Sequence, residues 1–167
     1  GCKKIAGMYL LLTKMGPLFL ADTTVNFTPS AEELAEITIM VAREVRHFSI
    51  TPRIAMLSYS NFGSSNSPEA RIVAQATEIV KRKQPDLIVD GEMQASTAFN
   101  KELLKENYPF SELVDKDVNT LIFPNLASGN ITYNILKELG SADADGRPST
   151  GIGPAGPLIA SSRASRA

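Results

Sequence analysis

Three polar loops contain the side chains whose types and spacing could support chemistry, and the first of them is SYSNFGSS. This loop supplies hydroxyl, amide and glycine groups at Ser58, Ser60, Asn61, Gly63 and Ser64. Glycine permits a positive φ, and a helix start at Ser67-Pro68 would aim free amides at the loop, so the segment could cradle a phosphate. A capped crossing from strand to helix is equally polar, so both interpretations stay open. The chain contains neither a Walker pattern nor G-x-S-x-G, which argues against a nucleotide P-loop and a hydrolase elbow.

Two acidic residues follow the next apolar run, in VDGEMQAS. Asp90 and Glu92 stand two positions apart at a predicted strand end, so both carboxylates could face one cleft as a general base or as metal ligands. The alternative is an ordinary Asp-Gly-Glu turn in which one carboxylate caps a helix that begins near Met93.

The third polar loop, FPNLASGNITY, surrounds a glycine at a predicted helix start. Its candidate residues are Asn125, Ser128, Gly129, Asn130 and Tyr133. Capping of the helix by Ser128 is the alternative interpretation. Elsewhere His47 is the single histidine and Cys2 the single cysteine, which argues against a zinc site and against a Ser-His-Asp triad.

Composition limits the class of protein. The 167 residues carry 17 basic and 18 acidic side chains, and this balance argues against a nucleic-acid partner. Cys2 has no partner for an intrachain disulfide, which fits a reducing compartment. The apolar run 8–12 is too short to cross a bilayer, so we expect no membrane segment and a cytoplasmic location. The chain begins with Gly1, and we expect it to be a piece of a longer polypeptide.

The elements that must position these loops can be predicted from periodicity and capping signals. Apolar runs predict a hairpin of strands 5–13 and 17–22, and buried strands at 53–59, 87–90 and 120–123. Helical spacing predicts helices over 31–48, 68–83 and 129–139, and Ser30 with Glu33 has the spacing of a capping box. The alternation of strands and helices predicts an α/β fold with a mostly parallel sheet and helices on both faces. In such a sheet the three polar loops should meet at the carboxyl edge.

The end of the chain differs in composition from the rest. From residue 141 it reads SADADGRPSTGIGPAGPLIASSRASRA, which is rich in Gly, Pro, Ala and Ser and shows neither helical nor strand periodicity. We therefore expect an α/β domain over 1–140 and a loosely ordered, atypical tail over 141–167.

Four segments, GPLFLADTTVN, PRIAMLSYSNFGS, PDLIVDGEMQ and IFPNLASGNITY, together resemble a known family. From residue 5 to about residue 144 the chain resembles the second domain of phosphate acetyltransferases (phosphotransacetylases), which has an isocitrate/isopropylmalate dehydrogenase-like fold. It looks most like the version at the C-terminus of bacterial multidomain NADP-dependent malic enzymes. SYSNFGS and the YPF at 108–110 favour that subgroup.

The resemblance implies acetyl transfer between coenzyme A and phosphate in a cleft between two α/β domains, without a metal. In the family an aspartate is the general base, and arginines and a serine hold phosphate and the developing charge. The three polar loops would then form walls of a cleft for acyl-CoA or phosphate. The family motif S-R-G-x-x-x-x-D is missing, because no aspartate follows Ser162-Arg163, and Asn134 stands where a lysine is common. The catalytic residues are therefore unassigned.

In the malic-enzyme subgroup the resemblance implies a module that binds acetyl-CoA, regulates the attached dehydrogenase and helps to assemble the oligomer. Acetyl-CoA or CoA and phosphate are then the expected partners, together with further copies of the chain in a homo-oligomer. The domain itself would bind no cofactor, and NADP and a divalent metal would belong only to a malic-enzyme parent, which converts malate to pyruvate and CO2. The alternative is part of an active phosphate acetyltransferase.

Overall fold

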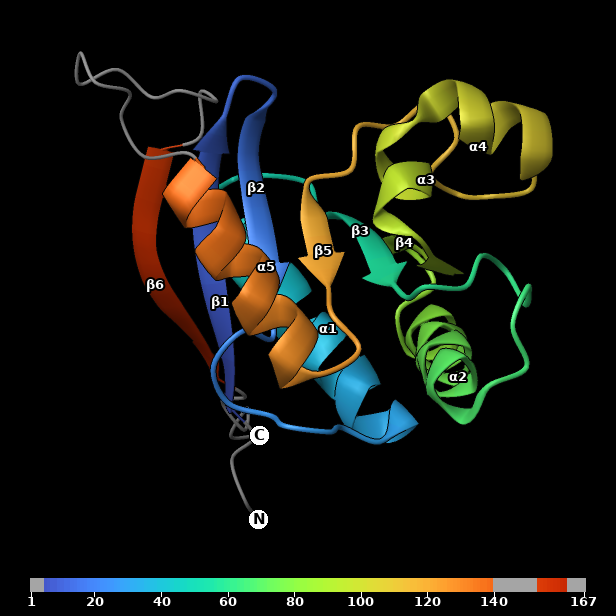
Figure 1. The fold of residues 1–167 in the computed structure, drawn as a ribbon, viewed down its shortest axis with the longest axis horizontal. Helices are drawn as coiled ribbons and strands as arrows, with labels where there is room; N and C mark the ends of the chain where they lie inside the picture. The colour runs from blue at the N-terminus through green and yellow to red at the C-terminus, as the bar shows by residue number, and fades with distance from the viewer. Residues whose placement is uncertain (1–4, 140–152, 162–167) are drawn as a thin grey trace.

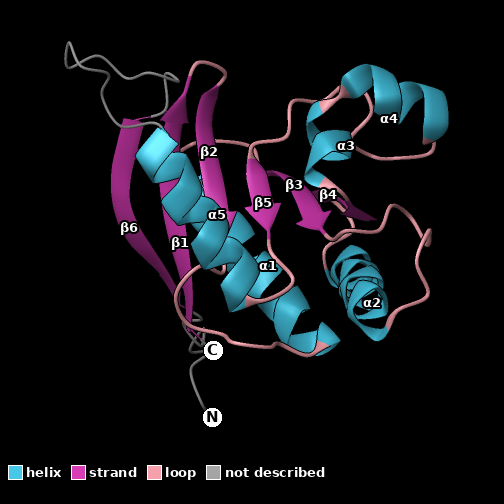
Figure 2. Cartoon of the chain, in the orientation of Figure 1, coloured by secondary structure: helices cyan, strands magenta, loops and turns pink. Residues whose placement is uncertain are grey.

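The computed structural model describes residues 5–139 and 153–161. Its elements, in chain order, are β1 (Ile5–Thr13), β2 (Gly16–Ala21), α1 (Ala31–His47), β3 (Arg53–Leu57), α2 (Pro68–Lys83), β4 (Ile88–Met93), α3 (Ala95–Phe99), α4 (Lys101–Asn107), β5 (Thr120–Ile122), α5 (Leu126–Leu139) and β6 (Gly153–Ser161). Figure 1 shows them coloured along the chain, and Figure 2 separates helices from strands.

The described strands form one six-stranded sheet in the order β4-β3-β5-β2-β1-β6. β3 pairs parallel to both β4 and β5, and β5 pairs parallel to β2. β1 pairs antiparallel to β2 and to β6, so it runs against the other strands of this sheet. The predicted α/β class, with a mostly parallel sheet, is confirmed.

Two apolar layers cover the two faces of the sheet. On one face, α1 and α2 pack on alternate strand residues that include Met8, Phe19 and Ile54. On the other face, α3, α4 and α5 pack on the intervening residues, among them Leu11 and Leu20. Figure 1 shows α1 behind the sheet and α5 in front of it. Because both faces are covered, ligands can bind at the loops that join the strands. These loops lie at the carboxyl ends of the parallel strands, called the carboxyl edge below, and at their amino ends, called the amino edge.

Local signals correctly located most of these elements. The hairpin pairs Thr13 with Gly16 across its turn, as the two apolar runs predicted. At the start of α1, the Glu33 N–H donates to Ser30 Oγ at 3.2 Å, and the Ser30 N–H donates to Glu33 Oε2 at 2.9 Å. This is the predicted capping box. α2 begins at Pro68 after the cap Ser67, also as predicted.

Three features differ from the sequence prediction. α3 and α4 have five and seven residues, too few for a periodic apolar pattern to be recognised. α5 begins at Leu126, earlier than expected. The expectation of a loosely ordered tail is wrong for Gly153–Ser161, which pairs with β1 as an edge strand, because backbone hydrogen bonds to a neighbour need no apolar alternation of their own. The rest of 141–167 lies outside the described residues.

Candidate functional site

The carboxyl edge of the sheet collects the loops that follow β2, β3, β4 and β5, because these four strands are parallel. The first two predicted loops touch each other directly there. The third predicted loop instead contacts the segment that follows β2, which was not among the candidates. The edge therefore contains two clusters of polar contacts, one around Glu92 and one around Asp22.

The loop after β3 does hold an anion, and that anion is the chain's own Glu92. Glu92 is 2% exposed, and its Oε1 accepts from Ser60 Oγ and from the Gly63 N–H, both at 2.7 Å. Gly63 adopts a φ of 86°, which lets its amide turn toward the carboxylate. Two of the donors that suggested a phosphate cradle are thus paired within the protein.

The remaining polar groups of this loop fix its shape. The hydroxyls of Ser60 and Ser64 hydrogen-bond at 3.2 Å, and the Asn61 N–H donates to Ser64 Oγ at 2.9 Å. Ser58 Oγ accepts from the Ser60 N–H at 3.2 Å. Asn61 Oδ1 accepts from the Gln94 N–H at 2.8 Å, which connects the loop to the end of β4. The loop is therefore an internally bonded crossing that joins two strand ends.

Asp90 points to different partners from Glu92. Its Oδ1 lies 2.8 Å from Lys81 Nζ at the end of α2, and its Oδ2 accepts from the Glu112 N–H at 2.9 Å. Asp90 is 3% exposed. The two carboxylates thus bind separate segments and do not share one set of partners. Neither caps α3, whose cap residue is Gln94 without a side-chain bond.

The loop after β5 is tied to the end of β2. Asn125 Oδ1 accepts from the Ser128 N–H at 2.9 Å, so Asn125, and not Ser128, caps α5. Asn130 Nδ2 donates to the Thr23 carbonyl at 3.3 Å. A Cβ at Gly129 would lie 2.3 Å from the Asp22 carbonyl oxygen, so only glycine lets α5 approach this closely. Tyr133 stacks on Tyr9, with ring centroids 3.5 Å apart.

Asp22 organises the segment after β2 and was missed as a candidate. It is 3% exposed, and its Oδ1 accepts from the N–H groups of Gly7 and Thr24, both at 3.0 Å, and of Val25 at 3.2 Å. Its Oδ2 accepts from the backbone N–H of Asn26 at 2.8 Å and from the Asn26 side chain. The available sequence signal was an aspartate at the last position of a predicted strand and before Thr-Thr.

A groove of about 780 Å3 opens beside the Glu92 cluster, between α2 and the loop after β3. Of the predicted site residues, Gly63 and Glu92 line it. Its apolar wall includes Phe62 and Phe110, whose rings pack edge-on with centroids 5.1 Å apart. Its charged lining comprises Glu32, Glu78, Glu92 and Arg82. Excess carboxylate makes this groove a poor site for a bare phosphate. A separate small cavity of about 90 Å3 lies beside Asn125.

No three His, Cys, Asp or Glu side chains gather into a possible metal site within the described part of the chain. In the same residues, no helix is long and apolar enough to cross a membrane.

Comparison with known proteins shows the family of this chain. The family described as phosphate acetyl/butaryl transferase matches residues 1–166. The chain therefore belongs to the phosphate acetyl/butaryl transferase family. This confirms the resemblance inferred from the four sequence segments.

The relatives fall into two groups. The chain is 44% identical over 137 residues to an NADP-dependent malic enzyme of Escherichia coli, covering 82% of this chain and 18% of that protein. It is 40% identical over 146 residues to a phosphate acetyltransferase of Bacillus subtilis, covering 87% of this chain and 45% of that protein. A phosphotransacetylase structure from Streptococcus pyogenes superimposes with a TM-score of 0.81 at 36% identity, over 93% of this chain and 45% of that one. The chain thus spans less than half of each of these relatives.

Proposed function

We propose that this chain is an acyl-CoA-binding regulatory and assembly domain of a bacterial malic enzyme, and that it has no acetyltransferase activity by itself. The observation that carries the proposal is that the carboxyl-edge loops lack cationic side chains and have donors already bonded within the protein. Segments 58–65, 90–94 and 123–130 contain no Lys or Arg. The donors at Ser60 and Gly63 are already paired with Glu92. Transfer to phosphate requires cations around a developing negative charge, and these loops supply none.

The groove beside Glu92 supports binding of the nucleobase end of CoA. Phe62 is half-buried and Phe110 is 67% exposed, so an aromatic face is available for stacking. An exposed carboxylate such as Glu78 can accept from an exocyclic amine, whereas it repels phosphate. The groove would therefore take the base, and the phosphates of CoA would lie outside it.

Acetyl-CoA titration tests this binding role. We expect calorimetry to detect acetyl-CoA binding to the 167-residue chain and to the longer protein that contains it. Phe110→Ala should weaken binding roughly tenfold, since the stacking surface is lost. Phe99→Ala, at the opposite edge of the sheet, is the matched control and should leave binding unchanged. In the longer protein, acetyl-CoA should change the rate of malate oxidation. Absence of both binding and a rate effect contradicts the proposal.

The assembly role is supported by an apolar stripe on α5. Ile131, Ile135 and Leu139 follow one another at intervals of four residues, and they are 57%, 52% and 57% exposed. Large exposed apolar side chains in a row favour association, and a second copy of the chain gives a symmetric dimer. Light scattering after size exclusion should show a dimer or a larger assembly. Ile135→Lys should shift it to monomer, whereas a wild-type monomer at high concentration contradicts the assembly role.

An active phosphate acetyltransferase is the second candidate. It is favoured by the TM-score of 0.81 to the Streptococcus pyogenes phosphotransacetylase, over 93% of this chain. The reaction would convert acetyl-CoA and phosphate to acetyl phosphate and CoA. An assay for acetyl phosphate on the longer protein that contains this chain separates the two candidates, because only the acetyltransferase would show turnover. The isolated 167-residue chain should show no turnover in either case, and measurable turnover by it would overturn the proposal that it is inactive alone.

A further inference from the structure

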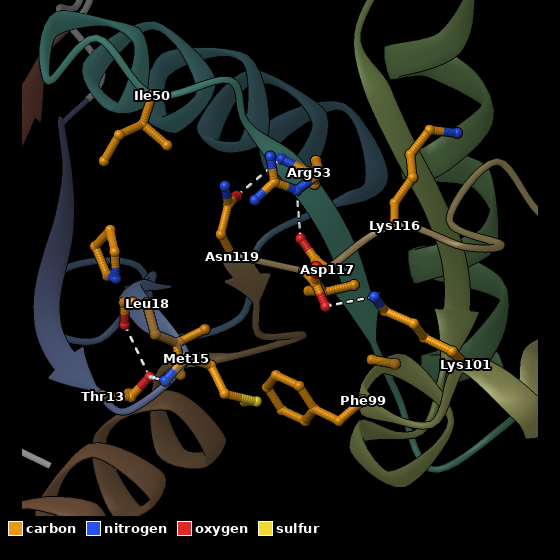
Figure 3. Close-up of a pocket in the computed structure, with 14 residues that line it drawn as sticks. Thr13, Met15, Leu18, Ile50, Arg53, Phe99, Lys101, Lys116, Asp117 and Asn119 are labelled. Atoms are coloured by element: carbon orange, nitrogen blue, oxygen red, sulfur yellow. Dashed lines mark hydrogen bonds and ion pairs between the residues drawn. The ribbon is translucent and has the colours of Figure 1, made fainter. Parts of the chain in front are cut away.

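A second cavity, of about 230 Å3, lies at the amino edge of the sheet, away from the carboxyl-edge loops. It is bordered by the hairpin turn, by the first residue of β3, by the segment just before β5, and by the junction of α3 with α4. Figure 3 shows the lining side chains. The residues used below are Met15, Arg53, Phe99, Lys101, Asp117 and Asn119.

The lining of this cavity is cationic, although the chain as a whole has a net charge of -1. Arg53 and Lys101 contribute positive charge, Asp117 contributes the opposing carboxylate, and the Lys116 ammonium is bonded instead to the Glu112 carbonyl. Lys101 Nζ lies 2.6 Å from Asp117 Oδ1, and Arg53 Nε donates to the Asp117 backbone carbonyl. One carboxylate cannot balance two cations, so the cavity favours an anion.

Asn119 gives the cavity a fixed polar floor. It is 5% exposed, and its Oδ1 accepts from the Arg53 N–H at 2.9 Å while its Nδ2 donates to the Thr51 carbonyl at 2.9 Å. These bonds join the starts of β3 and β5. The backbone that carries Arg53 is thereby held in place without a ligand, so little conformational entropy is lost when one binds.

The opposite wall is apolar and exposed. Met15, at the hairpin turn, is 79% exposed, and Phe99 is 43% exposed. Figure 3 shows their side chains pointing toward each other, across the cavity from Arg53. A ligand that fits this arrangement has an anionic end and an apolar body.

We propose that this amino-edge cavity binds a small organic carboxylate, with its carboxylate between Arg53 and Lys101 and its aliphatic part against Met15 and Phe99. The guanidinium fork of Arg53 matches the geometry of a carboxylate. The volume of about 230 Å3 is below the roughly 300–1,000 Å3 of pockets for drug-sized ligands, so a nucleotide is too large. The apolar wall selects against inorganic phosphate, which would leave it uncovered.

Asp117 acts as an internal competitor for the ligand. Its side chain occupies Lys101, and the Lys101 hydrogen bond and positive charge lower the pKa of its carboxyl, so it is ionised at neutral pH. An incoming carboxylate must replace it at Lys101. Removing the Asp117 charge should therefore strengthen binding of the ligand. If the Lys101–Asp117 pair were only structural, removing that charge would not strengthen binding.

The experiment is an amide NMR titration of the 167-residue chain with four compounds. The probes are 4-methylpentanoate, its uncharged amide, acetate and inorganic phosphate. We expect 4-methylpentanoate to bind at least tenfold more tightly than each of the others, since only it has both the charge and the apolar body. Shifts should be concentrated at residues 13–18 and 98–101. Equal affinity for the amide, tighter binding of phosphate, or shifts centred on Gly63 would each overturn the proposal.

Substitutions sharpen the test. Lys101→Gln should weaken 4-methylpentanoate binding roughly tenfold, and Asp117→Asn should strengthen it about threefold or more. Lys116→Gln is the charge-matched control, because Lys116 Nζ donates to the Glu112 carbonyl and points away from the cavity in Figure 3. It should change affinity less than Lys101→Gln does. Asp117 and Lys101 are exposed enough for both variants to fold, and weaker binding by Asp117→Asn contradicts the proposal.

Discussion

The two edges of the sheet use charge in opposite ways. At the carboxyl edge, buried Asp22 and Glu92 accept hydrogen bonds from the loops around them, so the chain's own anions hold those loops. At the amino edge, Arg53 and Lys101 border a cavity, and the carboxylate of Asp117 that faces them is exposed. The polar loops at the carboxyl edge therefore hold the fold together, whereas the amino edge offers two cations whose one carboxylate partner is exposed. Substitutions at the first edge should mainly change stability, and those at the second should mainly change ligand affinity.

The largest effect is expected at Asp22. Asp22→Ala leaves four backbone N–H groups and the Asn26 side chain without their acceptor, one of them the buried Gly7 N–H. We expect the free energy of unfolding to fall by about 3–5 kcal/mol, measured by urea denaturation. Asp22→Asn keeps one oxygen acceptor and should lose less. A loss below about 1 kcal/mol for Asp22→Ala would contradict the statement that the carboxyl-edge carboxylates act mainly on stability.

The loss of stability caused by Gly129→Ala should be the next largest. The added Cβ would lie 2.3 Å from the Asp22 carbonyl oxygen and 3.3 Å from a Phe123 ring carbon, so α5 must move away from β2. We expect a loss of about 2–3 kcal/mol, although alanine is the better helix former. Ala127→Ser, at an exposed position of the same helix, is the control and should cost about 0.5 kcal/mol. Thermal unfolding of both variants checks the prediction, and equal melting temperatures contradict it.

The loss of stability caused by Glu92→Ala should be smaller again. It removes the acceptor for Ser60 Oγ and the Gly63 N–H, and we expect a loss of about 2 kcal/mol. Glu92→Gln, which keeps an oxygen acceptor, should recover part of that loss. If Glu92→Ala instead leaves stability unchanged and abolishes acetyl-CoA binding, the carboxylate serves the ligand and not the loop. Denaturation and calorimetry on the same samples distinguish these results.

The smallest effect concerns pH at the amino edge. Lys101 holds the pKa of the exposed Asp117 carboxyl below its usual value of 3.8. A lowered carboxyl pKa adds stability that is present above pH 3.8 and is lost as the pH falls through the lower value in the folded state. The stability difference between wild type and Asp117→Asn should therefore be small at pH 6 and vanish in strong acid. Glu102→Gln, a neighbouring exposed carboxylate, is the control. If the stability difference between wild type and Asp117→Asn grows on acidification, Lys101 does not stabilise the ionised Asp117 carboxyl.

Sequence by itself determined the elements whose signals are local. The hairpin, the capped starts of α1 and α2 and the buried strands follow from apolar spacing and from side chains a few residues apart, such as Ser30 and Glu33. The family was also readable, because its motifs are contiguous segments. α3 and α4 were missed because helices of five and seven residues show too few turns for a period to emerge.

Tertiary structure alone decided what the polar residues do. Ser60 meets Glu92 across 32 positions, and Asn130 meets Thr23 across 107. No local pattern encodes such pairs, because they arise only when parallel strands bring distant loops to one edge. The same reason applies to β6, whose partner β1 is at the other end of the described chain, and to the amino-edge cavity, where Arg53, Phe99 and Asp117 come from separate segments. Whether a polar side chain holds the fold or remains available to a ligand depends on these distant neighbours.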